Sequence, residues 1–341
     1  MLPLAAPGGE QEGSPMRVIV GVDLGGTNIV VGTVSEDGER VVGVERRRTP
    51  AAQGPDMVVK HIVGAVRESI TKAKAAWGSQ VEVIGVGIGS PGPIDTKNGI
   101  VVTSPNLGWT DVPLRRLVSE IVDLPATLEN DANCAVLGEC WRGAAKGAQV
   151  VVGITIGTGV GGGLVLDGKI FHGASDVAGE FGHMTIDATG RRCVCGNYGC
   201  LEAYASGPAI AKRAVESIEA GATSSLVTYV DGDLSRITAE EVYQAANDGD
   251  DLAQEVVRDT ACLLGAGIAN LVNICNPEMV VVCGGVTIAG EKLFRPLREE
   301  VARRAFLPAA DACRIVPGEL PGTAGVLGAV ASFKLQTTGS T

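Results

Sequence analysis

Short apolar runs alternate with longer amphipathic runs along the chain, and each kind of run predicts a different element. Residues 17–23, 81–88 and 279–283 have the length and composition of buried strands. Residues 56–76 place apolar side chains at helical spacing, and residues 251–274 extend such a pattern into a stretch that is apolar on most faces. The alternation predicts an α/β fold, in which ligands bind where strands end.

The first predicted strand ends at a carboxylate and a glycine turn. Asp23 is followed by Gly25, Gly26 and Thr27, and residues 29–34 and 40–44 then predict two further strands joined by a hairpin. The backbone N–H groups of a glycine turn can approach phosphate closely, and a carboxylate beside them can hold Mg²⁺ through water. A plain glycine hairpin explains this stretch equally well.

Residues 150–159 repeat the pattern of residues 18–27 position for position. Both are apolar strands with a central glycine, and the second ends in Gly157, Thr158 and Gly159. Such an internal repeat predicts two duplicated domains whose glycine turns face one cleft and share the phosphates of a nucleotide. Residues 157–162 also match the dinucleotide motif G-x-G-x-x-G, but that motif requires a helix immediately after it. Residues 164–169 predict a strand and a hairpin instead, which excludes a Rossmann site.

A polar triplet, Glu129-Asn130-Asp131, lies between a strand-like run at residues 124–128 and a predicted helix from residue 132. A carboxylate at such a junction faces outward beside free helix N–H groups, so Asp131 is the candidate catalytic base. The alternative is that Asp131 only caps the helix, which is the commoner role of aspartate at this position. Asn106, in an earlier polar loop, can donate to and accept from sugar hydroxyls, or it can satisfy its own turn.

Three cysteines crowd into one short loop. Cysteines at this spacing with a nearby histidine supply the ligands of a closed, structural zinc site, and free thiols are the alternative. The second ring nitrogen of that histidine and two nearby glutamates suit neutral hydroxyl groups. The predicted zinc ligands are His183, Cys193, Cys195 and Cys200, and the two glutamates are Glu180 and Glu202.

The composition excludes further classes of protein. The chain has 341 residues, is 45% hydrophobic and carries a net charge of −11, so it lacks the basic surface of a nucleic-acid binder. No apolar run reaches the length of a membrane span, and the P-loop motif is missing. Residues 1–15 lack the basic leader of a signal peptide and are expected to be a disordered leader, and the protein is expected in the cytoplasm.

Seven segments, in this order, resemble the ROK family of sugar kinases, and within it the bacterial-type glucokinases. The likeness runs from about residue 17 to residue 333, and the zinc loop is its most specific part. The segments are Asp23-Leu24-Gly25-Gly26-Thr27, Gly89-Ser90-Pro91-Gly92, Pro105-Asn106-Leu107-Gly108-Trp109, Glu129-Asn130-Asp131-Ala132-Asn133, Gly157-Thr158-Gly159-Val160-Gly161-Gly162-Gly163, Gly179-Glu180-Phe181-Gly182-His183 and the loop with Cys193, Cys195 and Cys200.

The resemblance implies an actin-like, ribonuclease-H-like fold of two duplicated domains with the active site in a central cleft. The expected smaller domain is residues 16–131 plus 321–335, and the expected larger domain, with the zinc loop, is residues 132–320. The resemblance also implies ATP, Mg²⁺ and structural Zn²⁺ as cofactors, glucose as the small-molecule partner, and a homodimer or homotetramer without nucleic-acid or membrane partners.

Site residues follow from the resemblance one by one. Asp131 matches the catalytic base. Asn106, Asn130, Asp131, Glu180, His183 and Glu202 match the sugar-binding positions. The nucleotide positions are matched by Asp23, Gly25, Gly26 and Thr27, by Gly157, Thr158 and Gly159, and by the glycine pair Gly284 and Gly285. That last pair also suits a simple strand-to-helix turn.

The expected reaction is ATP-dependent phosphorylation of the 6-hydroxyl of D-glucose. Three alternatives remain open at this point. The first is the same chemistry on another hexose, namely N-acetylmannosamine, N-acetylglucosamine, fructose or mannose. The second is a non-catalytic sugar sensor, and the third is a kinase that uses polyphosphate as its donor. The intact Asp131 argues against a sensor, and the acidic net charge argues against polyphosphate.

Overall fold

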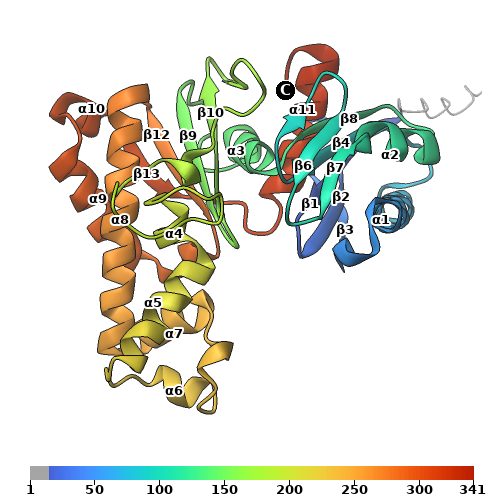
Figure 1. Cartoon of the computed structure of the whole chain (residues 1–341). Coiled ribbons are helices and arrows are strands. Elements are labelled where there is room, and N and C mark those ends of the chain that lie inside the picture. Colours follow the sequence, from blue (N-terminus) through green and yellow to red (C-terminus); the bar gives the residue numbers. More distant parts are fainter. Residues whose placement is uncertain (1–14) are drawn as a thin grey trace, which may run out of the picture.

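Two five-stranded sheets with matching topology form the framework of the protein. The computed structural model describes residues 15–341, so the expected leader lies almost wholly outside the described residues. The first sheet has the order β3-β2-β1-β4-β8 and the second the order β11-β10-β9-β12-β13. Figure 1 shows the two sheets side by side, each with helices on its outer face.

The strands of the first sheet are β1 (Met16–Leu24), β2 (Asn28–Ser35), β3 (Val41–Arg48), β4 (Val81–Ser90) and β8 (Ala126–Asn130). Those of the second are β9 (Val151–Ile156), β10 (Val160–Leu166), β11 (Lys169–Ile170), β12 (Met279–Gly284) and β13 (Arg314–Pro317). In each sheet the first three strands in the chain are antiparallel, and the last two join them in parallel. The repeat predicted from residues 150–159 is thus present in the topology of both sheets.

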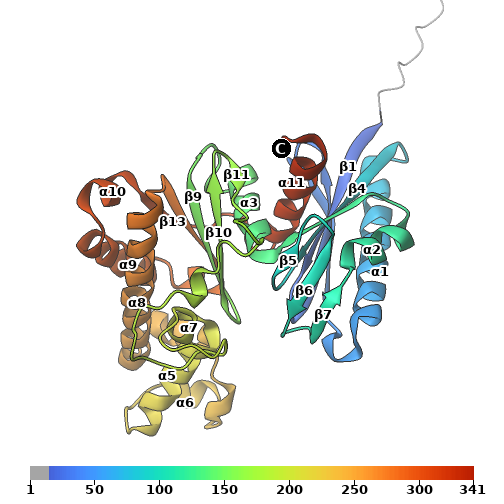
Figure 2. The same cartoon turned by 45° about the horizontal axis from the view of Figure 1, so that its top comes forward.

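Helices α3 (Asp131–Arg142) and α11 (Ala324–Thr338) lie between the two sheets (Figure 2). Leu137 and Trp141 of α3 pack with α11 and the first sheet, whereas Val136 packs with strands of the second sheet. The helix therefore has one face in each of two hydrophobic clusters.

Other helices cover the outer faces. The first sheet is covered by α1 (Pro55–Trp77) and α2 (Leu114–Val122). The second is covered by α4 (Glu202–Ala205), α5 (Gly207–Glu219), α7 (Ala239–Asp248), α8 (Asp251–Cys275) and α9 (Glu291–Arg304), with α6 (Leu226–Tyr229) and α10 (Leu307–Ala312) at the periphery. None of the helices within residues 15–341 combines the length and apolar character that a bilayer crossing requires.

A small three-stranded sheet precedes α2. It consists of β5 (Ile94–Asp95), β6 (Ile100–Ser104) and β7 (Trp109–Val112), and α2 begins after it at Leu114. Residues 91–93 separate β4 from β5. Strands this short have too few residues for a period-two pattern to emerge, so sequence patterns did not reveal them.

Glu139 is buried near the end of α3. It binds both segments that connect the sheets, the one from α3 to β9 and the one from β13 to α11. Its carboxylate accepts N–H bonds from Ala144, on the way to β9, and from Glu319 and Leu320, on the way to α11, at 2.9, 3.0 and 3.0 Å. Replacing Glu139 with alanine leaves three donors without an acceptor and is expected to cost about 3 kcal/mol of unfolding free energy.

The midpoint of urea unfolding measures this loss. The matched control is Glu319→Ala, because the exposed Glu319 side chain makes no bond to this cluster and only its backbone N–H takes part. An equal midpoint for the two variants contradicts the role of the Glu139 carboxylate.

Candidate active site and metal centre

The carboxyl ends of β1, β4 and β8 meet at one edge of the first sheet. Asp23 pairs with Gly89 on β4, and Gly89 pairs with Glu129 on β8. Because the three strands are parallel neighbours, Asp23 and the polar triplet predicted to hold the base lie at the same edge.

Asp131 is the first residue of α3, not its cap. The capping residue is Asn130, whose side chain accepts the Asn133 N–H at 3.1 Å. The Asp131 carboxylate accepts one hydrogen bond, from the adjacent Ala132 N–H at 2.9 Å. The capping alternative for Asp131 is therefore wrong, and the carboxylate is free to bind a substrate hydroxyl.

The surroundings of Asp131 tune it toward proton transfer near neutral pH. Burial raises the pKa of Asp131 to about 7, and the negative charges of Asp23 and Glu180 act in the same direction. Burial also raises the pKa of Asp23 to about 6, against the opposing charge of Arg46. A pKa near the working pH suits a general base, because the group must be ionised at that pH and still basic enough to accept a proton.

Asp23 also has a close packing partner in α11. A Cβ added to Gly325 would lie 2.3 Å from the Asp23 Oδ2 atom, so only glycine lets the helix approach this carboxylate. On the turn that follows Asp23, a Cβ on Gly26 would lie 3.1 Å from the Asn106 Cβ. The structure thus places the predicted sugar-binding Asn106 beside the first glycine turn.

The second glycine turn lies next to the glycine pair at the end of β12, where Gly284 is the last strand residue and Gly285 begins a short 3-10 helix. Gly284 pairs with Ile156, the last residue of β9, so Gly284 and Gly285 adjoin residues 157–159. The turn is tight: its Gly157 N–H donates to the Gly159 carbonyl at 2.9 Å. Residues 160–166 then form a strand, which confirms that the G-x-G-x-x-G motif is no Rossmann site.

His183 and the three cysteines gather into one cluster, with all four ligand atoms within 4.8 Å of one another. The Cys195 and Cys200 sulfurs are 3.7 Å apart, and the Cys193 Sγ lies 3.8 Å from the His183 Nδ1. Zinc–sulfur bonds of about 2.3 Å at tetrahedral angles place two sulfurs about 3.8 Å apart, so the donor set and spacing fit this ion.

Two glutamates connect the loop that carries Cys193, Cys195 and Cys200, called here the metal loop, to the rest of the site. Glu202 accepts the Val160 N–H at 3.0 Å and its other oxygen lies 3.7 Å from the Cys193 Sγ, so it links the second glycine turn to the loop. Glu180 is exposed, with a carboxylate oxygen 4.0 Å from the His183 Nε2. His183 therefore directs one ring nitrogen at the cysteines and the other at Glu180.

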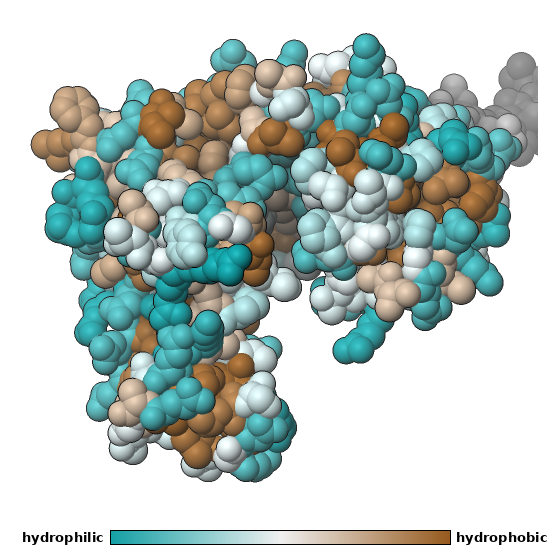
Figure 3. Space-filling model, in the orientation of Figure 1, coloured by the Kyte–Doolittle hydropathy of each residue, from teal (hydrophilic) through white to brown (hydrophobic). Residues whose placement is uncertain are grey.

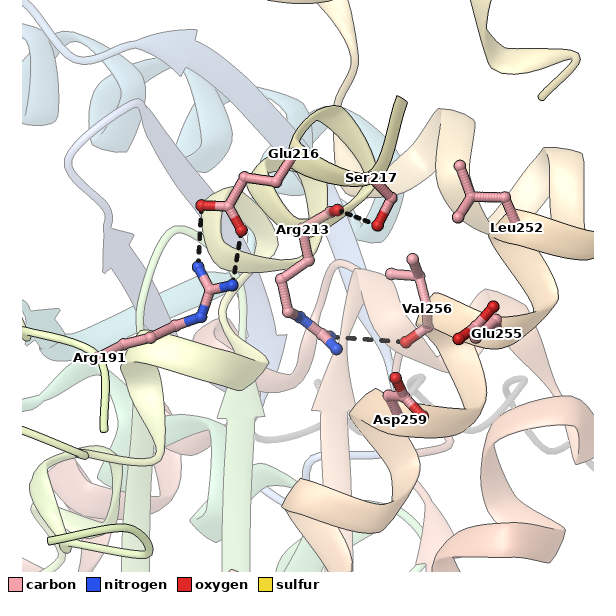
Figure 4. A pocket seen from close by; sticks show the side chains of 8 residues that line it. All are labelled: Arg191, Arg213, Glu216, Ser217, Leu252, Glu255, Val256 and Asp259. Carbon is pink, nitrogen blue, oxygen red and sulfur yellow. Dashed lines mark hydrogen bonds and ion pairs between the residues drawn. The ribbon is translucent and has the colours of Figure 1, made fainter. Parts of the chain in front are cut away.

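A polar pocket anchors the metal loop to the helices that cover the second sheet (Figure 4). Arg191 donates to both carboxylate oxygens of Glu216 on α5 at 3.1 and 2.6 Å, and its backbone N–H donates to the Tyr204 hydroxyl at 2.8 Å. Arg213 donates to the Val256 carbonyl of α8 at 3.5 Å. The lining includes none of the predicted site residues, and through Arg191 this pocket supports the loop.

Sequence patterns did not reveal every polar residue at the site. His172 contacts Glu129 at 2.8 Å, and Asp176 accepts two hydrogen bonds from Thr96. These partners come from distant segments and have no characteristic spacing. Asp176 also has a positive φ of 58°. Aspartate tolerates this conformation, but its presence in the sequence does not predict it.

The chain is similar to known proteins over most of its length. The chain is 39% identical to a glucokinase of Halalkalibacterium halodurans, over 92% of this chain and 93% of the relative. It is 33% identical to a xylose repressor of Caldicellulosiruptor bescii, over 92% of this chain and 77% of the relative. The crystal structure of a ROK family glucokinase from Streptomyces griseus in complex with glucose and AMPPNP has a TM-score of 0.80 at 34% identity, covering 92% of this chain and 98% of the other. The model of the ROK family matches residues 19–336, and the chain belongs to this family.

Proposed function

We propose that this protein transfers the γ-phosphoryl group of ATP to the 6-hydroxyl of D-glucose. The observation that supports this most directly is Asp131, a carboxyl with a pKa of about 7 at the edge where three parallel strands end. The glucokinase relatives, and the Streptomyces griseus structure with glucose and AMPPNP, support the choice of sugar and donor.

Asp131 acts as the general base. Phosphoryl transfer has a loose transition state, so catalysis depends on aligning the two oxygens and on offsetting charge. Asp131 holds the 6-hydroxyl in line and accepts its proton, while Asn106, Asn130, Glu180, His183 and Glu202 bind the remaining hydroxyls. Figure 3 shows the surface hollowed between the two halves of the molecule, and closure of the halves would exclude water as a competing acceptor.

Nucleotide binding is assigned to the glycine turns of the two sheets. The N–H groups of residues 26, 27, 158 and 159 would face the phosphates, because the Gly25 and Gly157 N–H groups are bonded within their own turns, and the Gly284-Gly285 backbone would adjoin the adenine. Asp23 is a suitable oxygen ligand for Mg²⁺, held directly or through water. The ion supplies charge neutralisation on the transferring phosphoryl group.

Zinc at the cysteine cluster is structural. His183, Cys193, Cys195 and Cys200 would fill four positions on the ion and leave none open for water, so it would take no part in the chemistry. His183, whose Nε2 lies 4.0 Å from the Glu180 carboxylate, would be kept in this orientation and available with Glu180 for hydroxyls.

The domain division follows the sheets. We assign residues 16–131 and 321–335 to the smaller domain, since α11 packs on the first sheet, and residues 132–320 to the larger one.

A cytoplasmic homodimer or homotetramer completes the proposal. The apolar side chains of Ile274, Phe306 and Leu307, which are 75%, 72% and 64% exposed near α10, support an interface there.

The pH dependence of the reaction tests the assignment of the base. Asp131 accepts a proton only when ionised, so kcat/KM for glucose should fall as pH decreases through about 7 and level off above it. Initial rates of glucose 6-phosphate formation at saturating ATP and Mg²⁺ measure this. A profile that stays flat from about pH 5.5 to 8 contradicts the assignment.

A panel of sugars and donors tests the function itself. Glucose, mannose, fructose, N-acetylglucosamine and N-acetylmannosamine are each supplied with ATP, and glucose is also supplied with polyphosphate. The proposal expects the highest kcat/KM for glucose with ATP. A higher value for another sugar or donor corrects the substrate, and sugar binding without any phosphorylation identifies a sensor.

A further inference from the structure

A short loop crosses from the second sheet to the first, close to the predicted base. It comprises residues 171–178, between β11 and the segment that begins at Gly179, and is called here the bridging loop. Its His172 Nε2 lies 2.8 Å from the Glu129 Oε2 at the end of β8. Its Asp176 Oδ2 accepts the backbone N–H and the hydroxyl of Thr96, between β5 and β6, at 3.0 and 2.9 Å.

Glu129 connects this contact to the start of α3. The side chain is 2% exposed, and its Oε1 accepts the Asn130 N–H at 2.9 Å and the Asn133 Nδ2 at 3.0 Å. A carboxylate so deeply buried needs hydrogen bonds to both oxygens, and His172 supplies the one to Oε2. The hydrogen bond to Glu129 and the charges of Glu129 and Asp176 raise the pKa of His172, which favours the imidazolium.

The other end of the bridging loop leads directly to the predicted sugar-binding residues Glu180 and His183. The loop is closed on itself by a bond from the Ala178 N–H to the His172 carbonyl at 3.1 Å. A displacement of His172 would therefore move the segment that presents Glu180.

We propose that His172 is a positioning residue of the kinase site. Through Glu129 it holds the turn that bears Asn130 and Asp131, and through the bridging loop, anchored at Thr96, it holds Glu180 against the same sugar. The contact between His172 and Glu129 thereby sets the distance between Asp131 and the segment that bears Glu180. This inference rests on the proposed function.

Two substitutions of His172 separate positioning from general packing. His172→Ala removes the donor and should raise the dissociation constant of glucose at least tenfold, about 1.4 kcal/mol, in calorimetric titrations without ATP. The KM for ATP should stay within twofold of the wild type. His172→Gln restores an N–H donor to Glu129 and should recover most of the affinity.

Asp176, which anchors the bridging loop to Thr96, provides a test that does not disturb the buried carboxylate of Glu129. Asp176→Gly removes the bonds to Thr96 while glycine adopts the φ of 58° without strain, and it should weaken glucose binding about threefold. The matched control is Asp167→Gly, an exposed aspartate with a φ of 52° in the β10–β11 turn, which should bind glucose like the wild type.

Each outcome decides the inference. Glucose affinities within twofold of the wild type in His172→Ala and in Asp176→Gly overturn it, as does an equal loss in His172→Ala and His172→Gln. If His172→Ala does not fold, Asp176→Gly against Asp167→Gly decides alone. A wild-type protein that binds none of the panel sugars refutes the proposed function itself, which a change confined to the variants does not.

Discussion

Replacing Asp131 with alanine is expected to lower kcat by about 10²-fold or more while glucose binding remains measurable. The carboxylate has a pKa of about 7 and lies at the start of α3, at the edge where three parallel strands of the first sheet end. Without it the 6-hydroxyl must lose its proton to water. Asn130, Asn106 and the metal loop still bind the sugar, so the loss falls on turnover.

The measurement is kcat at saturating glucose and ATP, together with a calorimetric titration of glucose. Asp131→Asn serves as the shape-matched control, because the amide can still hydrogen-bond the hydroxyl but cannot accept its proton. Both variants should be equally slow. Turnover close to the wild type in either one removes Asp131 from the role of base.

Cys195→Ser is expected to release the metal and to abolish glucose binding. A serine hydroxyl is a poor zinc ligand, and in small metal sites the binding energy of the ion is also folding energy of the loop. Residues 184–201 contain no helix and only isolated bridges, so little besides the ion and the Arg191 anchor holds their shape. His183 then loses its orientation toward Glu180, and the sugar loses two of its partners.

Metal content by atomic spectroscopy and glucose titration measure the two effects together. Cys313→Ser is the control, since Cys313 is also partly exposed but lies next to β13, far along the chain from the loop. It should retain the metal and the affinity. A metal-free Cys195→Ser protein that phosphorylates glucose normally contradicts the structural role of the ion.

Much of this site was accessible from local patterns in the chain. The positions of Asp23 near the end of β1 and of Asp131 directly after β8 follow from apolar runs that stop at a polar residue. The predicted zinc ligands follow from a spacing that is typical of metal sites, and the structure brings their four ligand atoms together. The repeat of residues 18–27 at 150–159 predicted duplicated domains, and the structure contains two five-stranded sheets of matching topology.

The remainder depends on contacts between distant segments. Glu202 binds the N–H of Val160, His172 binds Glu129 and Glu139 binds the segment at residues 319–320, and none of these pairs has a sequence spacing that marks it. The short strands β5 to β7 depend on one another for hydrogen bonds, so their own residues do not define them. The capping role of Asn130 instead of Asp131 differs by a single position, which sequence patterns do not resolve.

The two-sided packing of α3 has a mechanical consequence. A helix whose opposite faces are inserted in two separate cores cannot slide against either without opening a void, which close-packed interiors resist. Any rotation of one half of the enzyme relative to the other must then pivot near this helix. Asp131, the proposed proton acceptor at the start of this helix, would stay almost stationary at the axis, while the glycine turns proposed to bind phosphate sweep the larger arcs.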